Sequence, residues 1–160
     1  MIVVGYFGRN GANRIVNTIT KALLDALKLS QNANVLDVGA SAGFFTCKIA
    51  KKIHTSIPDA GFFAMDLTPA MLLSLAEKKT GITPFVGIAE NIKDSIKYAQ
   101  RHLEIPSKFE AIFSTLMLHH SVQPERVFES FKSVLSKNGR AIVVDMCEHS
   151  FEEFKTEMGD

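Results

Sequence analysis

The first place where side chains could do chemistry is a glycine-containing turn. The segment Asp37–Gly43 (DVGASAG) begins at the end of the apolar run at 34–38 and leads into a helical pattern. Gly39 and Gly43 permit a tight turn whose backbone N–H groups can approach a ligand closely. The Asp37 carboxylate suits a ligand that carries positive charge at one end and an anionic group at the other.

S-adenosylmethionine carries this combination of charges, and two alternatives compete with it. A dinucleotide fingerprint needs glycines at its first, third and sixth positions, but positions 39, 41 and 44 hold Gly, Ser and Phe, which disfavours a nicotinamide cofactor. The turn could also serve packing alone. A second site must therefore decide between ligand and packing.

That second site is a carboxylate after the next apolar run. Asp66 stands 23 residues beyond Gly43, within the segment AMDLTPAML at 64–72. A carboxylate at this position can accept hydrogen bonds from both ribose hydroxyls. The alternative is a stabilising charge at a helix N-terminus, worth about 0.3–1 kcal/mol, with Thr68 as a further candidate cap.

The elements that position these residues alternate along the chain. Apolar runs cover residues 34–38, 62–65, 83–88, 109–114 and 140–146. Helical patterns cover residues 16–29, 42–54, 69–81 and 92–103, another runs from Pro124 to a stop at Asn138-Gly139, and a last begins near Ser150. Such alternation predicts an α/β fold, with a parallel sheet covered on both faces and ligands at the carboxyl ends of its strands.

Composition narrows the class of protein. A chain of 160 residues with 46% hydrophobic residues predicts one soluble domain. The net charge of +1 gives no sign of a nucleic-acid surface, and no apolar run is long enough to span a membrane. Cys47 and Cys147 lack metal-ligand spacing, so we expect no metal site, a reducing compartment and a cytoplasmic location.

Four ordered blocks of sequence resemble the class I S-adenosylmethionine-dependent methyltransferases, in particular the small-molecule branch that includes ubiquinone and menaquinone biosynthesis enzymes. The blocks are VLDVGASAGFFT at 35–46, MDLTPAML at 65–72, FEAIFSTLMLHH at 109–120 and LSKNGRAIVVD at 135–145. The resemblance covers about Leu23 to Asp145, which includes all four blocks.

The resemblance implies a three-layer α/β/α Rossmann-like methyltransferase fold, with a parallel sheet of about five strands in the order 3-2-1-4-5. We expect a single domain, with an N-terminal segment and helix at 1–30, a core at 31–148 and a terminal helix at 149–160. The fold would be reduced at the C-terminus, because the family's last two strands have no counterpart. Three candidates could cover the open edge of strand five: the segment Met1–Val4, the terminal helix or a second chain. We favour a homodimer.

The residue types and the resemblance together give a set of cofactor-binding candidates. Gly39, Ala40 and Gly43 would line the methionyl and sulfonium part, Asp66 the ribose, and Leu67 and Met71 the adenine. The family's usual adenine-binding Asp is replaced by Ile88, which leaves the backbone of Ala89 and the side chain of Glu90 for the adenine edge. The full set is Asp37, Gly39, Ala40, Ser41, Gly43, Asp66, Leu67, Met71, Ala89, Glu90 and Thr115.

Two adjacent histidines follow strand four near the expected methyl group. Histidine, whose unperturbed pKa is about 6.5, is a suitable base for a hydroxyl, thiol or enol acceptor. His119 and His120 are therefore the catalytic candidates. A structural hydrogen-bonding role for His119 is the alternative. A metal pair is disfavoured, because no third ligand lies at suitable spacing.

The predicted function is S-adenosylmethionine-dependent methyl transfer to a small-molecule acceptor, with S-adenosylhomocysteine as product. Methyl transfer is an in-line displacement, for which alignment of the acceptor and exclusion of water can suffice. A protein acceptor stays open. The alternative from another class is a non-catalytic module of the same fold that binds S-adenosylmethionine or a partner protein.

Overall fold

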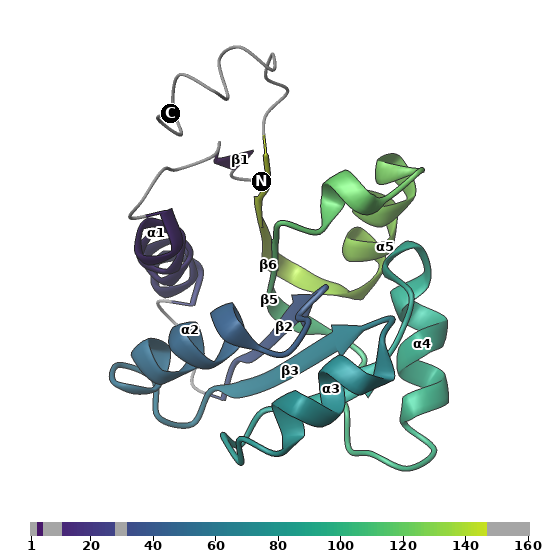
Figure 1. The fold of residues 1–160 in the computed structure, drawn as a ribbon, viewed down its shortest axis with the longest axis horizontal. Helices are drawn as coiled ribbons and strands as arrows, with labels where there is room; N and C mark the ends of the chain where they lie inside the picture. The colour runs from purple at the N-terminus through teal and green to yellow at the C-terminus, as the bar shows by residue number, and fades with distance from the viewer. Residues whose placement is uncertain (1–2, 5–10, 28–31, 147–160) are drawn as a thin grey trace, which may run out of the picture.

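The computed structural model describes residues 3–4, 11–27 and 32–146, which form one parallel sheet with helices on both faces (Figure 1). The strands are β1 Val3–Val4, β2 Asn34–Val38, β3 Gly61–Asp66, β4 Thr83–Val86, β5 Phe109–Thr115 and β6 Leu135–Val144. Their order across the sheet is β1-β6-β5-β2-β3-β4. Leaving β1 aside, this is the predicted order 3-2-1-4-5, so the predicted fold class is confirmed.

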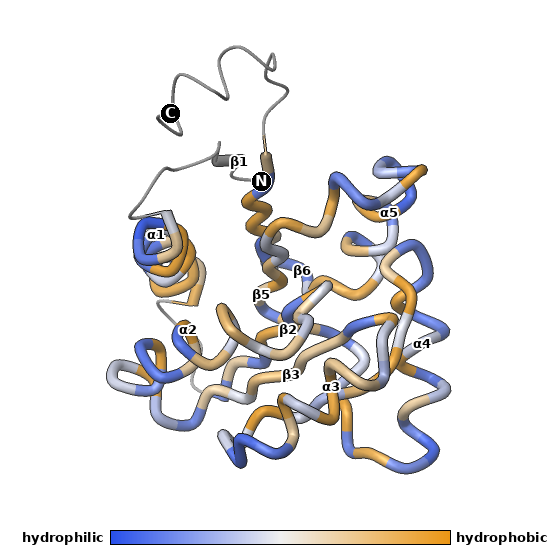
Figure 2. The backbone as a smooth tube through the Cα atoms, in the orientation of Figure 1, coloured by the Kyte–Doolittle hydropathy of each residue, from blue (hydrophilic) through white to orange (hydrophobic). Residues whose placement is uncertain are grey.

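The helices form two layers. They are α1 Gly11–Ala26, α2 Phe44–His54, α3 Pro69–Ala76, α4 Ile92–Ala99 and α5 Pro124–Val134, with short 3₁₀ turns η1 Ala89–Asn91 and η2 Leu118–His120. Alternation along β2 separates two cores: Val35 packs with α1 and α2, and Leu36 packs with α4 and α5. The hydrophobic side of α1 faces the sheet (Figure 2). No helix in the described part of the chain is long and apolar enough to cross a membrane.

The topology brings functional segments together beside β2. This central strand pairs with β3 on one side and with β5 on the other, so the chain changes direction across the sheet at this point. In open parallel sheets such a switch leaves a crevice outside the carboxyl ends of the strands. The segments after β2, β3, β4 and β5 therefore converge at one edge.

Several predicted boundaries were wrong. The helix α1 begins at Gly11 rather than Val16, because its first turn is mostly exposed and adds little apolar periodicity. The helix α3 ends at Ala76 rather than near Gly81, and Lys79 takes a left-handed conformation with φ 49°. Likewise β4 ends at Val86 and α4 ends at Ala99.

The pair Asn138-Gly139 does not end a helix. The helix α5 stops at Val134, because Leu135 takes an extended conformation with φ −70° and ψ 142° and begins β6. Phe109 pairs with Leu135 and Ala111 with Arg140, so two steps along β5 match five along β6. The Asn-Gly pair therefore lies in a bulge within β6.

The edge of β6 opposite β5 pairs with β1, in the register Val3 to Val143 and Val4 to Val144. The N-terminal segment was one of the three candidates for covering that edge. The helix predicted from Ser150 lies outside the described residues, as does Cys147. The homodimer stays a prediction.

Candidate functional site

Two adjoining cavities lie at the carboxyl ends of the strands. Their volumes are about 300 and 410 Å³. Both are lined by Gly39, Asp66, Thr68, Met117 and His120, which follow β2, β3 and β5. We call them the smaller cavity and the larger cavity. Their common wall places the predicted glycine turn and the predicted ribose carboxylate at one site.

The glycine turn shapes the wall between the cavities. Gly39 has φ 79°, and a Cβ atom at this position would overlap Cγ of Met117. The N–H groups of Gly39 and Ala40 both donate to the Met65 carbonyl, at 2.9 and 3.0 Å, which fixes the turn against β3. Only glycine meets both requirements at position 39 without strain.

Gly43 is the N-cap residue of α2. Its φ is 78°, and a Cβ atom there would overlap Cδ1 of Leu75 on α3. The residue is buried and lines neither cavity. Gly43 therefore lets the start of α2 pack closely on α3, below the site.

Asp66 joins two loops of the site. Its Oδ2 accepts the Ser41 N–H at 2.8 Å, and its Oδ1 accepts the Thr68 N–H at 2.8 Å. The Thr68 side chain makes no capping hydrogen bond to α3, so the carboxylate serves the start of that helix. Each carboxylate oxygen has a further lone pair for a ligand in the cavities.

Asp37 is a buried carboxyl on the larger cavity, with only 2% of its surface exposed. Burial raises its pKa to about 7, against the lowering effect of the Thr46 hydroxyl and with a smaller raising effect from Asp66. The Thr46 hydroxyl donates to Oδ2 at 2.6 Å. Within the described part of the chain, Oδ1 has no partner.

A second orphaned oxygen lines the same cavity. Thr115 is buried at the end of β5, and its Oγ1 has no hydrogen-bond partner among the described residues. Buried polar atoms in native proteins are almost always paired. Of the three such oxygens among the described residues, Asp37 Oδ1 and Thr115 Oγ1 belong to residues that line the larger cavity, and they indicate a ligand group with hydrogen-bonding capacity there.

The smaller cavity has both apolar and polar lining groups. Leu67 and Ile88, each more than half exposed, line it together with Ala89 and Glu90. Glu90 Oε1 accepts the Ser121 hydroxyl at 2.7 Å, which leaves its second oxygen for other donors. Met71, by contrast, lines the larger cavity, so the two predicted adenine neighbours lie on different cavities.

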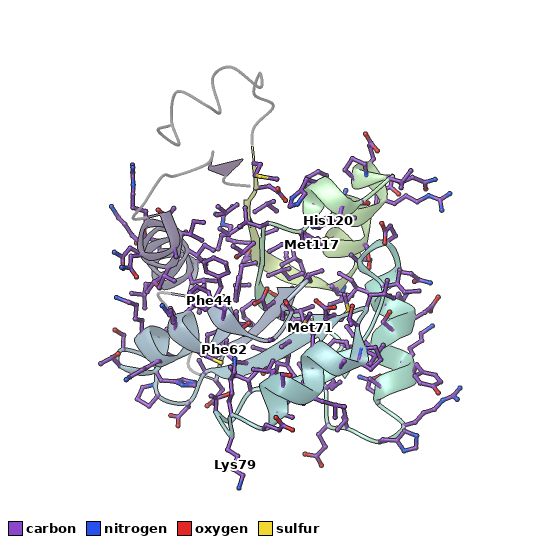
Figure 3. The ribbon with its side chains drawn as sticks, viewed as in Figure 1. Phe44, Phe62, Met71, Lys79, Met117 and His120 are labelled. Atoms are coloured by element: carbon purple, nitrogen blue, oxygen red, sulfur yellow. The ribbon has the colours of Figure 1, made fainter. Side chains whose placement is uncertain are left out.

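The two histidines have different surroundings. His119 Nδ1 lies 2.6 Å from Asp145 Oδ1, and Asp145 also accepts the Leu118 and Met146 N–H groups. His119 lines neither cavity. His120, labelled in Figure 3, lines both cavities. Its ring centroid lies 3.9 Å from that of His119. His119 is thus anchored by Asp145, and His120 borders the site.

Sequence reasoning missed several partners. Thr46 holds Asp37, Asp145 holds His119, and Ser121 holds Glu90. Only Asp145 had a usable signal, since it is an acidic residue at the end of a strand next to β5. Among the described residues, no three histidine, cysteine or acidic side chains are placed to hold a metal ion.

Comparisons with known proteins agree with this architecture. A family model for a methyltransferase domain matches residues 29–159. No curated protein sequence matches the chain. The solved structure of the YcgJ protein from Bacillus subtilis aligns with a TM-score of 0.60 and 21% identity, covering 83% of this chain and 50% of that one.

Two further solved structures have the same fold. The DszA carbon methyltransferase aligns with a TM-score of 0.72 and 18% identity, covering 89% of this chain and 38% of that one. The plantazolicin methyltransferase BpumL, in complex with SAH (S-adenosylhomocysteine) and a monoazolic desmethylPZN analog, aligns with a TM-score of 0.66 and 14% identity, covering 95% and 54%. The chain spans about half or less of these structures.

Proposed function

This chain belongs to the methyltransferase domain family, and from that premise we propose that it binds S-adenosylmethionine and transfers the methyl group to a small-molecule acceptor. One observation carries the proposal: Asp37 Oδ1 and Thr115 Oγ1 are buried on the larger cavity and have no hydrogen-bond partner among the residues that the structure describes. The ammonium group of the cofactor supplies the missing donors, and a carboxylate is a strong acceptor for it.

The remaining wall of the larger cavity fits the methionyl and ribose parts of this cofactor. We assign the ribose hydroxyls to Asp66, whose oxygens have free lone pairs. Gly39, Ala40 and Ser41 lie against the methionyl chain, and the place of all three on the wall of the larger cavity supports this assignment.

The adenine is assigned to the smaller cavity. Leu67 and Ile88 offer apolar surface for the adenine ring. We assign the Ala89 N–H and the Glu90 side chain, which belong to the same cavity lining, to the polar edge of the adenine. Met71 extends the apolar surface on the side of the larger cavity. Ile88 replaces the carboxylate that the family resemblance led us to expect, so Glu90 is the acidic group for the adenine amino group.

S-adenosylmethionine supplies a methyl group on a positively charged sulfur: the carbon–sulfur bond breaks with its electron pair going to sulfur, as an acceptor lone pair bonds the carbon. The protein's part is to align the acceptor and to exclude water. We assign the acceptor's proton to His120, which borders both cavities. His119, held by Asp145, supports the His120 ring.

Calorimetric titration with S-adenosylmethionine and S-adenosylhomocysteine, followed by an assay of methyl release over a metabolite panel, tests the proposed function. We expect both ligands to bind and one acceptor class to be methylated. Binding without turnover on any acceptor would favour the non-catalytic module. Failure of both ligands to bind would overturn the proposal.

Replacement of His120 by glutamine is expected to lower kcat by at least about a hundredfold when the acceptor must lose a proton, because general bases contribute about 10²–10⁴-fold. S-adenosylhomocysteine affinity should stay within about twofold. The loss should shrink with rising pH, since the acceptor then ionises without help. His102→Gln, at an exposed site beyond α4, is the matched control. Equal kcat values for the His120→Gln and His102→Gln variants would rule out His120 as the general base.

A further inference from the structure

A third cavity lies apart from the candidate site, between α1 and α2. Its volume is about 680 Å³. Asn13 and Asn17 line it from α1, and Lys48, Lys51 and Lys52 line it from α2. No acidic side chain of the described residues lines this space, which we call the α1–α2 groove.

The three lysines of the groove share one face of α2. Their spacing of three and four residues places Lys48, Lys51 and Lys52 side by side on α2, where like charges disfavour one another. None of the three forms an ion pair within the described part of the chain. The last turn of a helix favours cations, which accounts for Lys51 and Lys52, but Lys48 lies a full turn earlier.

The groove is connected to the candidate site through Phe44. The Lys48 Nζ atom lies 4.3 Å from the centroid of the Phe44 ring, and that ring lines the larger cavity. Phe44 is 52% exposed and lines the larger cavity, while its neighbour Lys48, one turn along α2, lines the groove. In the view of Figure 3, Phe44 lies between α1 and Met117.

We propose that the α1–α2 groove binds an anionic group, a phosphate or carboxylate, carried by the methyl acceptor. The acceptor's apolar body lies on Phe44, and its anionic end is held by Lys48, Lys51 and Lys52, with Asn13 as a neutral donor from α1. This inference rests on the proposed function, because it takes the acceptor's other end to lie at the larger cavity.

Helix geometry sets the length of such an acceptor. At about 1.5 Å rise per residue, Lys48 lies about 6 Å and Lys52 about 12 Å along α2 from Phe44. An acceptor whose anionic group is separated from its apolar contact by several carbon atoms spans this distance. A compact anion cannot contact Phe44 and the lysines of the last turn at once.

The test uses the full chain saturated with S-adenosylhomocysteine and titrated with octyl phosphate. The groove variant is Lys48→Gln/Lys51→Gln/Lys52→Gln. The control variant Lys93→Gln/Lys132→Gln/Lys137→Gln removes the same charge from exposed lysines on α4, α5 and β6. We expect the groove variant to lose at least about tenfold in octyl phosphate affinity, and the control variant to stay within about twofold. Equal loss in both variants, no loss in the groove variant, or no binding to the unaltered chain would overturn the proposal.

Two more probes and one further titration make the result specific. Octanol lacks the anion and inorganic phosphate lacks the apolar body, so each should bind at least about tenfold more weakly than octyl phosphate. Equally tight binding of inorganic phosphate would contradict the path across Phe44. S-adenosylhomocysteine affinity should be the same in both lysine variants. If the unaltered chain does not bind S-adenosylhomocysteine, the proposed function is refuted. If it binds S-adenosylhomocysteine but its octyl phosphate binding does not depend on the three lysines, only the groove proposal is refuted.

Discussion

Replacement of Asp66 by alanine is expected to weaken S-adenosylhomocysteine binding by roughly ten- to a hundredfold, or about 1.5–3 kcal/mol. The carboxylate lines both cavities and would accept both ribose hydroxyls. It also accepts the Ser41 and Thr68 N–H groups, so alanine frees two loops of the site. Isothermal titration calorimetry at pH 8 measures the loss.

Two further variants separate the ribose contact from loop anchoring. Asp66→Asn retains one acceptor oxygen and the side-chain volume, so we expect an intermediate affinity. Asp59→Ala removes an exposed carboxylate from the loop before β3 and should leave affinity unchanged. A folded Asp66→Ala protein that binds S-adenosylhomocysteine as tightly as the unaltered chain would exclude the ribose assignment. Binding of NAD in place of S-adenosylhomocysteine would favour the nicotinamide alternative.

The fold was predictable because buried parallel strands have a strong local signal. The run Asn34–Val38 is apolar and flanked by turn residues, and its predicted bounds match β2. Helix ends were less predictable, since apolar periodicity marks only the buried turns. At Asn138-Gly139 tertiary pairing made the local helix-stop signal irrelevant: α5 already ends at Val134, and β5 pairs with β6 from Leu135 onward.

The site was predictable only where residues follow a strand directly. Asp37, Asp66 and Thr115 stand at strand ends, and all three line a cavity as the topology requires. The partner Thr46 lies on α2 and reaches Asp37 only because that helix folds back over β2. Which of two adjacent histidines borders the cavities depends on η2, a turn of three residues whose orientation has no periodic pattern in the sequence.

Replacement of Asp37 by asparagine is expected to stabilise the ligand-free protein at pH 8. The folded-state pKa of Asp37 is about 7, against an ordinary value of 3.8, so the folded state holds the proton more tightly than the unfolded state does. The free energy of unfolding therefore falls as pH rises from about 4 to about 7, and stays low above that. Asparagine has no charge to desolvate and can still accept the Thr46 hydroxyl, so its advantage should be present at pH 8 and absent below about pH 4. Urea unfolding at both pH values measures the difference.

The same substitution should have the opposite effect on binding. The ammonium of S-adenosylhomocysteine favours the ionised carboxylate, so the affinity of the unaltered chain should rise between pH 6 and pH 8, by up to tenfold for each pH unit below the pKa. Binding at pH 7 should release a fraction of a proton, which calorimetry in buffers of different ionisation enthalpy detects. Asp37→Asn should bind at least about tenfold more weakly at pH 8, without this pH dependence.

The opposite signs of the two effects identify what Asp37 does. If the Asp37 carboxyl served only to hold α2 on the sheet through Thr46, its substitution would make the protein less stable and would change ligand affinity only indirectly. If the desolvation of the Asp37 carboxylate in the ligand-free protein is offset by a bound ammonium, the asparagine variant must be more stable without ligand and must also bind the ligand more weakly. An asparagine variant that is less stable at pH 8, or that retains the affinity and pH dependence of the unaltered chain, would contradict the assignment of Asp37 to the cofactor's ammonium group.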